Sequence, residues 1–425
     1  MNNTIKKQNR TGILVRGLIV LAMCGIVNSA AVFVSPMAQH FGWTTEAIAG
    51  VATWMAFMQT PGHILSGWML GKFGAKKTLI TGCVLLGLAF LLSGFVPASS
   101  PWMLYITFSV LQGLGVGFTY TGSTYCATGW YPDKRGLASG LCMAFNGGSA
   151  TFLAPLIVKL IGSVGITVAL YIVGAAIMVI GICAAIGMKS APVGYAPDGW
   201  KAKEDDPKLA ATQLESLTPA QAFKTRAYWH LFLGYGFFPT MYIICYPRFS
   251  VLIQEAGYSV SAATLGVSIY SICNVLGRLG MGALIDKLGY RKVYTICGIC
   301  SIASSICLMF ANNLFMFYLA YILLAVGFGA TNTCHPVAVQ ETFGSKYAGG
   351  IFGICMLGYM IICTFISPRI SSALVNATGS YTASMIYAII ACVIAVCVYT
   401  TIPQPKRRTL AEVEAEEAAK AAAKA

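Results

Sequence analysis

Runs of about 20 mostly apolar residues, separated by short polar loops, recur from one end of the chain to the other. A helix of that length crosses the ~30 Å hydrocarbon core of a bilayer, because each residue adds ~1.5 Å. Twelve runs qualify, at residues 13–35, 46–70, 78–96, 101–127, 136–160, 166–188, 228–253, 262–285, 292–311, 314–338, 348–375 and 380–402. Only 10% of the 425 residues are charged, against about 25% in soluble globular proteins. The pattern predicts an all-α polytopic membrane protein with twelve transmembrane helices.

The basic residues are confined largely to alternate loops and to the two tails. The chain has 28 Lys and Arg against 14 Asp and Glu, a net charge of +14. Intervening loops such as 36–45, 161–165 and 254–261 contain no Lys or Arg. The positive-inside rule therefore places both termini and the central linker in the cytoplasm, with the chain in a cell inner or plasma membrane. This distribution explains the positive charge without a nucleic-acid partner.

The sequence carries no pattern typical of an enzyme or of a metal or cofactor site. The fifteen cysteines lie mainly in the apolar runs, where small apolar packing is their ordinary role. Cys297 and Cys300 form a CxxC, but no further His or Cys stands at ligand spacing. We therefore predict no cofactor, no metal and no catalytic residues.

The chain divides into two similar halves. Residues 1–188 and 227–403 each contain six spans, the linker 189–226 joins them, and a tail follows at 404–425. Within the linker, Thr218 and Pro219 form a helix-start pattern. GWMLGKFGAKK (67–77) matches GALIDKLGYRK (282–292) at an offset of 215 residues. Duplicated six-helix halves with a site at the bilayer midplane are a transporter architecture.

The second copy of this loop is similar to the loop signature of the major facilitator superfamily. The first copy departs from the signature, because Gly71 stands where the pattern has Asp. WYPDKRGLASG (130–140) resembles a stretch of the oxalate/formate antiporter family, in the monocarboxylate-porter-like branch. The resemblance implies a twelve-helix transporter whose cytoplasmic gate contacts come from loop residues. These are Gly67, Lys72, Gly74, Asp133, Arg135, Asp286, Lys287, Gly289 and Arg291.

Arg278 is the leading candidate for a binding residue. It lies eight residues before Asp286 in the run 262–285, which places it ~12 Å inside the membrane. An arginine at that depth is costly and marks a functional site by default. Every acidic residue of the sequence lies outside the middle of a span, which favours a bound anion over a buried ion pair. A guanidinium suits a carboxylate, which it meets with two parallel hydrogen bonds.

Asn274 and Tyr270 lie one and two helical turns before Arg278, on the same face. Asn274 is expected to donate to the substrate or to hold the guanidinium, and simple packing is an equal alternative. In many animal-type monocarboxylate porters, the resemblance puts a proton-coupling Asp at this position. This chain has Asn274 there, and an amide side chain does not titrate, so Asn274 cannot carry the coupled proton.

The resemblance also implies further cavity positions. In oxalate-exchanging members, the Arg of the eighth span is paired with a Lys whose position corresponds to Tyr359. One buried cation suits one carboxylate, so a monocarboxylate is favoured over oxalate. The remaining positions that the resemblance implies, each with packing as an equal alternative, are Tyr120, Asn146, Phe328, Asn332 and Met356.

Two histidines lie within spans, His63 and His335. Imidazole titrates near neutral pH, so each is a candidate for proton coupling. A hydrogen-bonded core histidine is the alternative for both. His335 is the better candidate because it lies one turn from Asn332.

The sequence therefore predicts a monomeric secondary transporter of a small organic anion, most simply lactate, pyruvate or a similar monocarboxylate. A proton or a counter-anion is the expected coupling partner, and symport, exchange and facilitated diffusion stay open. One alternative is an exchanger or exporter of a dicarboxylate or a larger amphipathic acid. Another is a membrane sensor that binds the same ligand without moving it.

Overall fold

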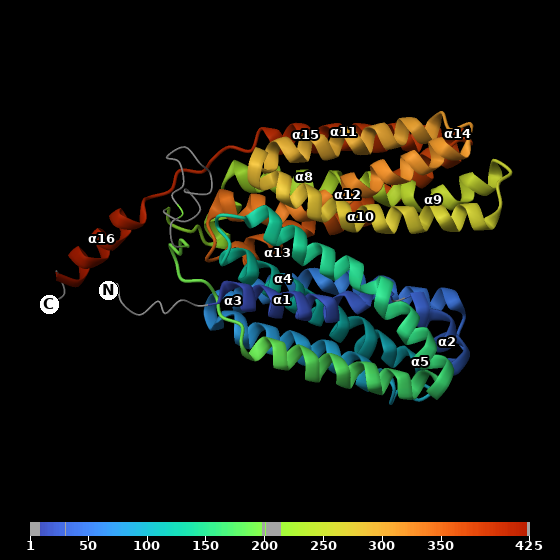
Figure 1. Cartoon of the computed structure of the whole chain (residues 1–425), viewed down its shortest axis with the longest axis horizontal. Coiled ribbons are helices and arrows are strands. Elements are labelled where there is room, and N and C mark those ends of the chain that lie inside the picture. The colour runs from blue at the N-terminus through green and yellow to red at the C-terminus, as the bar shows by residue number, and fades with distance from the viewer. Residues whose placement is uncertain (1–8, 30, 198–199, 201–213, 423–425) are drawn as a thin grey trace. The chain divides into compact units, whose positions relative to one another are not determined.

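The structure is a computed structural model of the chain and describes residues 9–29, 31–197, 200 and 214–422 (Figure 1). Over these residues, regular structure is helical apart from one isolated antiparallel bridge between Leu214 and Thr409. Residues 198–199 and 201–213 of the expected linker lie outside the described part, as does the start of the basic N-terminal tail.

Ten helical stretches of the described residues are long and apolar enough to cross a membrane. Two of them, α3 (Thr45–Ser93) and α5 (Arg135–Ile186), have 49 and 52 residues, which is about 75 Å of helix and more than twice a hydrocarbon core. Each is kinked at a glycine with positive φ, Gly74 at 78° and Gly165 at 79°. Each stretch thus contains two spans, and the predicted all-α fold with twelve transmembrane helices is confirmed.

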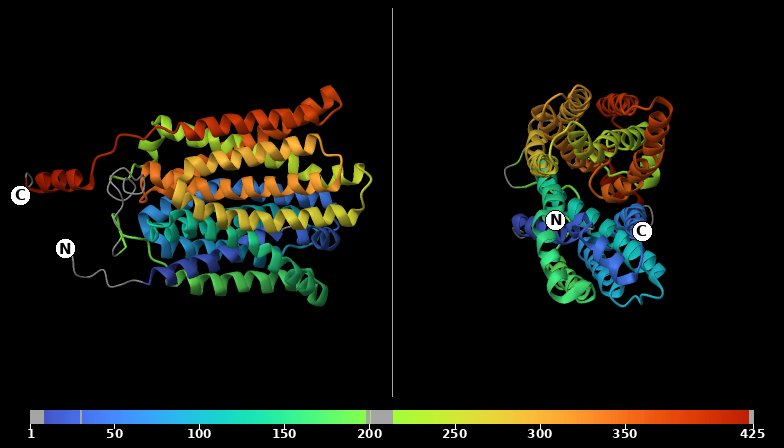
Figure 2. Two further views of the ribbon diagram at one scale, coloured as in Figure 1. Left: turned by 45° about the horizontal axis from the view of Figure 1, so that its top comes forward. Right: turned by 90° about the vertical axis from the view of Figure 1, so that its right-hand side faces the viewer.

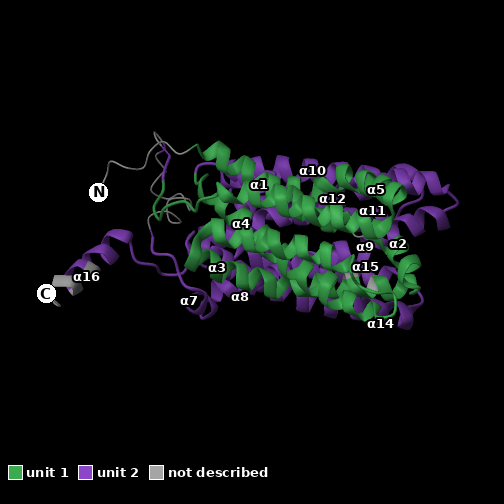
Figure 3. Ribbon diagram, turned by 90° about the horizontal axis from the view of Figure 1, so that it is seen from below, with its two compact units in different colours: residues 1–132, 144–195 green, residues 133–143, 196–425 purple. Residues whose placement is uncertain are grey.

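The described residues form two compact units, coloured separately in Figure 3. Unit 1 comprises residues 1–132 and 144–195, and unit 2 comprises residues 133–143 and 196–425. Besides α3 and most of α5, unit 1 contains α1 (Arg10–Cys24), η1 (Gly25–Ser29), α2 (Ala31–Phe41), η2 (Pro101–Met103), the π-helix η3 (Tyr105–Leu111) and α4 (Gln112–Gly129).

Unit 2 begins with the first turns of α5 and continues after the linker. Its elements are α7 (Pro219–Phe223), α8 (Arg226–Phe237), α9 (Thr240–Glu255), α10 (Val260–Leu288), α11 (Tyr290–Met309), α12 (Leu314–Phe343), α13 (Ala348–Gly358), the π-helix η4 (Tyr359–Ile366), α14 (Ser367–Thr378), α15 (Thr382–Thr400) and α16 (Leu410–Ala422). The views in Figures 1 and 2 both show α10 and α12 side by side, and the two helices are in extensive contact.

Buried hydroxyls in the spans bond back to their own helices. Thr119 and Thr128 in α4 donate to the carbonyls four residues earlier, at 2.8 Å each. Thr331 in α12 does the same at 2.9 Å. Polar groups at membrane depth need such internal partners, because lipid offers none.

The first turns of α5 belong to unit 2 because small residues let them approach α10 closely. Gly136 and Gly140 are spaced as GxxxG, a pattern that favours close helix packing. A Cβ on Gly136 would lie 2.2 Å from the carbonyl oxygen of Gly282, and a Cβ on Gly140 would lie 2.5 Å from that of Arg278. Side chains at either position would push the two helices apart.

The structure supports the internal repeat and the predicted start of the linker helix. Gly74 and Gly289 occupy matching positions of the repeated loop and have φ of 78° and 81°, a conformation that glycine adopts without strain. Thr218 caps α7 in a capping box with Gln221, as its sequence predicts.

Candidate functional site

Arg278 lies inside the 29-residue helix α10, ten residues before its end. Its side chain is half-buried, and Nη1 donates to the main-chain oxygen of Met143 at 2.5 Å. Gly329 of α12 faces it, and a Cβ there would meet Arg278 Cγ at 3.2 Å. The absence of a side chain at Gly329 therefore makes room for the arginine stem between α10 and α12.

Asn274 is buried one turn before Arg278, and its amide nitrogen donates in two directions. It donates to the carbonyl of Ala325 on α12 at 3.0 Å and to the hydroxyl of Tyr270 at 3.5 Å. The ring of Tyr270 is stacked against that of Tyr242 of α9, with centroids 6.0 Å apart and planes 26° apart. Asn274 and Tyr270 of α10 thus contact α12 through the main-chain carbonyl of Ala325 and α9 through the ring of Tyr242.

Aromatic rings surround these residues. The ring of Tyr242 is stacked on Phe328 of α12, with centroids 4.0 Å apart and planes 11° apart. Tyr246 lies one turn further along α9, at 4.9 Å from Tyr242 and 4.5 Å from Tyr270. We call Tyr242, Tyr246, Tyr270 and Phe328 the aromatic cluster.

The positive charge of Arg278 acts electrostatically on both Tyr242 and Tyr270. Phe328, a predicted cavity position, thus contacts Tyr242 directly.

Asn332 and His335 are joined through Tyr235 of α8. The Tyr235 hydroxyl donates to Asn332 Oδ1 at 3.0 Å, and its ring is stacked on His335 at 3.9 Å and 10°. His335 is fully buried, and its Nδ1 is hydrogen-bonded to the Tyr399 hydroxyl of α15. The structure thus places His335 among aromatic rings, and its role in proton coupling stays a prediction.

Two further predicted positions lie on the α13–η4 stretch. Tyr359 begins the π-helix η4, and its ring lies 5.7 Å from that of Tyr235. Met356 is half-buried near the end of α13.

Unit 1 holds the predicted residues Tyr120, His63 and Asn146. His63 of α3 is buried and shares a hydrogen bond with Thr121 Oγ1 at 2.7 Å, and its ring lies 5.3 Å from that of Tyr120. Asn146 of α5 donates to the carbonyl of Leu21 at 3.5 Å and accepts at its own carbonyl from Asn28 at 2.9 Å. These contacts fix all three within unit 1.

At the charged end of α10, Asp286 accepts hydrogen bonds from the first turn of α5. The amides of Gly136 and Leu137 donate to its two oxygens at 2.8 and 2.9 Å. A carboxylate at a helix N-terminus is favoured by the unpaired amides and by the helix dipole. Arg291 donates to the carbonyls of Thr400 and Ile402 at the end of α15, at 3.4 and 2.5 Å.

The remaining loop residues of unit 2 are Arg135, Asp133, Lys287 and Gly289. Arg135 is almost fully buried and donates to Ser345 Oγ at 3.3 Å. Asp133 precedes α5, while Lys287 is exposed in the last turn of α10 and Gly289 ends it. In unit 1, Gly67, Lys72 and Gly74 lie in α3, with the Lys72 ammonium 5.1 Å from the ring centre of Trp68.

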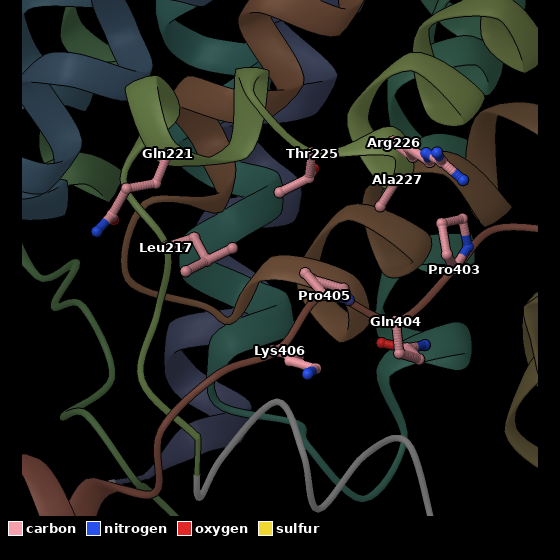
Figure 4. Close-up of a pocket in the computed structure, with 9 residues that line it drawn as sticks. All are labelled: Leu217, Gln221, Thr225, Arg226, Ala227, Pro403, Gln404, Pro405 and Lys406. Carbon is pink, nitrogen blue, oxygen red and sulfur yellow. The ribbon is translucent and has the colours of Figure 1, made fainter.

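A pocket of about 360 Å³ lies elsewhere in unit 2, between the α7–α8 corner and the segment after α15 (Figure 4). Figure 4 shows Pro403, Gln404, Pro405 and Lys406 on the segment that passes this corner. None of the predicted binding residues lines it, so it is separate from the Arg278 site.

Sequence reasoning did not select Tyr235, Tyr242 or Tyr246. A signal was present: these tyrosines are spaced by seven and four residues in the seventh span, so they share one helix face. Aromatic residues are also common in packing between helices. The spacing alone therefore does not distinguish a binding role for these tyrosines from a packing role.

Comparison with known proteins agrees with this architecture. The family model described as the Major Facilitator Superfamily matches residues 17–264 and 231–424. The chain is 27% identical over 300 residues to the uncharacterized MFS-type transporter YhjX of Escherichia coli, covering 70% of this chain and 71% of that protein. It is 26% identical over 350 residues to the oxalate:formate antiporter of Oxalobacter formigenes, covering 79% and 78%. It is 23% identical over 402 residues to monocarboxylate transporter 12 of Rattus norvegicus, covering 88% and 81%.

The fold is shared with a solved transporter. The crystal structure of the Escherichia coli fucose:proton symporter FucP superposes with a TM-score of 0.70 at 14% identity, covering 92% of this chain and 98% of that chain. The family model covers both units with their twelve apolar spans. The chain is a transporter, not an enzyme, and it belongs to the major facilitator superfamily.

Proposed function

We propose that this transporter moves a small organic anion with a single carboxylate, of the lactate or pyruvate type, by alternating access. Arg278 binds the carboxylate. The observation that carries the proposal is the place of Arg278: half-buried in the middle of a membrane-spanning helix, with its charge acting on the hydroxyl-bearing rings of Tyr242 and Tyr270. A guanidinium and hydroxyl donors are the groups that a carboxylate needs.

Two relatives support a carboxylate substrate through their names, the oxalate:formate antiporter and monocarboxylate transporter 12. At the position where oxalate-exchanging relatives carry a second cation, this chain has the neutral Tyr359. A dianion would then have half its charge uncompensated at membrane depth, which is costly. A monocarboxylate satisfies the single cation.

Neutralisation of charge also links substrate binding to the conformational change of the transporter. A bound carboxylate brings a negative charge to the Arg278 guanidinium and neutralises it. Neutralisation lowers the electrostatic cost of enclosing the site, so the loaded transporter passes between its two open states more readily. We further propose that it acts as a monomer in a cell inner or plasma membrane with both termini cytoplasmic.

The test is uptake into proteoliposomes across a panel of labelled mono- and dicarboxylates. We expect Arg278→Gln to abolish uptake of the preferred anion, because an amide supplies no charge. Arg248→Gln is the matched control: Arg248 also lies in a span of unit 2, but its guanidinium is stacked on the Tyr381 ring at 3.3 Å. It should keep most of the uptake.

Normal uptake by Arg278→Gln would end the proposal. Ligand binding without any flux would instead identify a sensor. Two further arms separate the coupling modes, one with a pH gradient and one with an internal counter-anion. Exchange is the second candidate function, because one relative is named as an antiporter, and stimulation only by the counter-anion would establish it.

A further inference from the structure

The pocket at the α7–α8 corner of unit 2 has a counterpart in unit 1. The counterpart has a volume of about 280 Å³ and lies between the start of α1 and the residues that follow α5. The unit 2 pocket, of about 360 Å³, lies between the start of α8 and the segment after α15 (Figure 4). The first span of each half begins with α1 or α8, and the last span ends with α5 or α15. The two halves thus carry a pocket at the same place in their repeated architecture.

Both pockets are lined by two cations. Arg16 and Lys189 line the pocket of unit 1, and Arg226 and Lys406 line that of unit 2. All four residues are exposed. Neither pocket has an Asp or Glu among its described lining residues. Two positive charges in a pocket lined by no described carboxylate favour an anionic ligand.

Each pocket also contains the start of a helix. Thr225 caps α8, and its hydroxyl accepts from the amide of Tyr228 at 3.2 Å. Asn9 caps α1, and its Oδ1 accepts from the amide of Gly12 at 3.0 Å. Both capping residues line their pockets. A helix start carries the positive end of the helix dipole and binds phosphate groups readily, so it adds to the attraction of the two cations.

The walls of the two pockets are shaped by glycine and proline. In unit 1 the Arg16 guanidinium lies against Gly187, where a Cβ would come within 1.3 Å of Nη1. A side chain at Gly187 would therefore displace the guanidinium. In unit 2, Pro403 and Pro405 lie on the segment after α15 (Figure 4). The proline rings fix φ, so this wall loses little conformational freedom when a ligand binds.

Exposed aromatic side chains mark the level of the membrane surface at the unit 2 pocket. Phe223 and Trp229 lie three residues before and after Arg226 and are 46% and 42% exposed. Their ring centroids are 5.1 Å apart. Tryptophan is enriched where lipid head groups meet the hydrocarbon, which places the pocket at the level of the head groups.

We propose that each pocket binds the head group of an anionic phospholipid, from the leaflet on the side that we propose to be cytoplasmic. The cations and the helix start hold the phosphate, while the acyl chains stay in the bilayer beside the spans. The two volumes are near the lower end of the ~300–1,000 Å³ usual for ligand pockets, which suits a head group. Basic pockets between spans on the cytoplasmic side match the charge of such lipids. A lipid bound there contacts both the first and the last span of one half.

The experiment is native mass spectrometry of the purified transporter, titrated with phosphatidylglycerol or with phosphatidylcholine. It counts the bound lipids and measures their Kd. We expect wild type to bind phosphatidylglycerol, one molecule per pocket, in preference to phosphatidylcholine. Arg226→Gln with Lys406→Gln should weaken one of these sites, and Arg16→Gln with Lys189→Gln should weaken the other. We expect each cation removed to raise the Kd of its site about 5-fold.

Two further variants separate a built site from diffuse attraction. Lys76→Gln with Lys77→Gln removes the same charge from two exposed residues that line neither pocket, and it should keep both lipids. Gly187→Ala keeps every charge and displaces the Arg16 guanidinium, so it should weaken the unit 1 site alone. Inorganic phosphate, added at constant ionic strength, should leave the lipids bound, because it lacks the acyl chains that hold them beside the spans.

Equal binding of phosphatidylcholine and phosphatidylglycerol by wild type would overturn the inference. So would equal losses in the Lys76 and Lys77 control, which would show that only the overall positive charge attracts the lipid. Displacement of the lipids by inorganic phosphate would identify a soluble anion as the ligand and would overturn it as well. Thermal unfolding checks that each variant is folded, and if a double variant is not, wild type and Gly187→Ala decide. None of these outcomes depends on Arg278, so the proposed function is tested separately by uptake.

Discussion

Two charges on α10 lie eight residues apart and are held in opposite ways. Asp286, at the end of the helix, has each carboxylate oxygen hydrogen-bonded to an amide of the first turn of α5, at 2.8 and 2.9 Å. Arg278, in the middle, contacts a main-chain carbonyl and acts on the hydroxyl-bearing rings of Tyr242 and Tyr270. The carboxylate at the end of the helix joins two helices, whereas we propose that the guanidinium inside the helix binds a ligand.

This difference predicts that Arg278 needs its shape as well as its charge. Arg278→Lys keeps a cation but loses the planar fork that meets a carboxylate with two hydrogen bonds. We expect the KM for the preferred monocarboxylate to rise about 10- to 100-fold, the effect of one charge-assisted hydrogen bond. Concentration-dependent uptake in proteoliposomes measures it. An unchanged KM would mean that a point charge is enough and would weaken the comparison with Asp286.

At the end of α10, the effect of a substitution should appear in stability. Asp286→Asn keeps one acceptor oxygen but loses the negative charge that favours the N-terminus of α5. We expect the free energy of unfolding in detergent to fall by about 1 kcal/mol, read as a lower Tm. The neighbouring, exposed Lys287→Gln is the control and should change the Tm little. A Tm for Asp286→Asn equal to that of the control would show that the two hydrogen bonds do not depend on charge.

Some features of this structure could be predicted from the sequence, because they depend on residues close together in the chain or on the bilayer. The apolar runs predict the twelve helices, because a bilayer imposes one length and one polarity on each. The capping pattern at Thr218 was equally readable, since its partners lie three residues away. Arg278 was selected from the sequence because an arginine at membrane depth has few structural explanations, and its binding role stays a prediction.

The partners of these residues were not readable, because they come from other helices. Nothing in the sequence around Asp286 says that its ligands are the amides of Gly136 and Leu137, 150 and 149 residues away. Tyr242 and Tyr270 become a pair only when α9 and α10 pack together. The placement of His335 against Tyr235 and Tyr399 is also tertiary, and its proton-coupling role stays a prediction.

The smallest predicted effect lies in the C-terminal segment, near the same end of unit 2. Burial and the nearby charge of Arg135 lower the pKa of Arg407 to about 10, and its Nη2 donates to the carbonyl of Glu341 at 3.2 Å. A lowered folded-state pKa means that the charged form destabilises the fold at every pH below 10. Above that value the folded state releases the proton before the unfolded chain does, so stability rises with pH. At neutral pH the whole cost is present.

Arg407→Gln should therefore be neutral or stabilising at pH 7, by less than about 1 kcal/mol, because solvent screens a half-exposed charge and one hydrogen bond is lost in return. Arg408 is the matched control: it is exposed and forms ion pairs with Glu215 at 2.9 Å and Glu416 at 2.5 Å. Arg408→Gln should lower the Tm slightly, the opposite sign. Thermal unfolding of both variants at pH 7 compares them, and a clear destabilisation by Arg407→Gln would show that its hydrogen bond to Glu341 outweighs the repulsion from Arg135. The charge of Arg407 would then stabilise the fold, as we expect for the charge of Asp286. Both would differ from the charge of Arg278, whose proposed role is to bind a ligand.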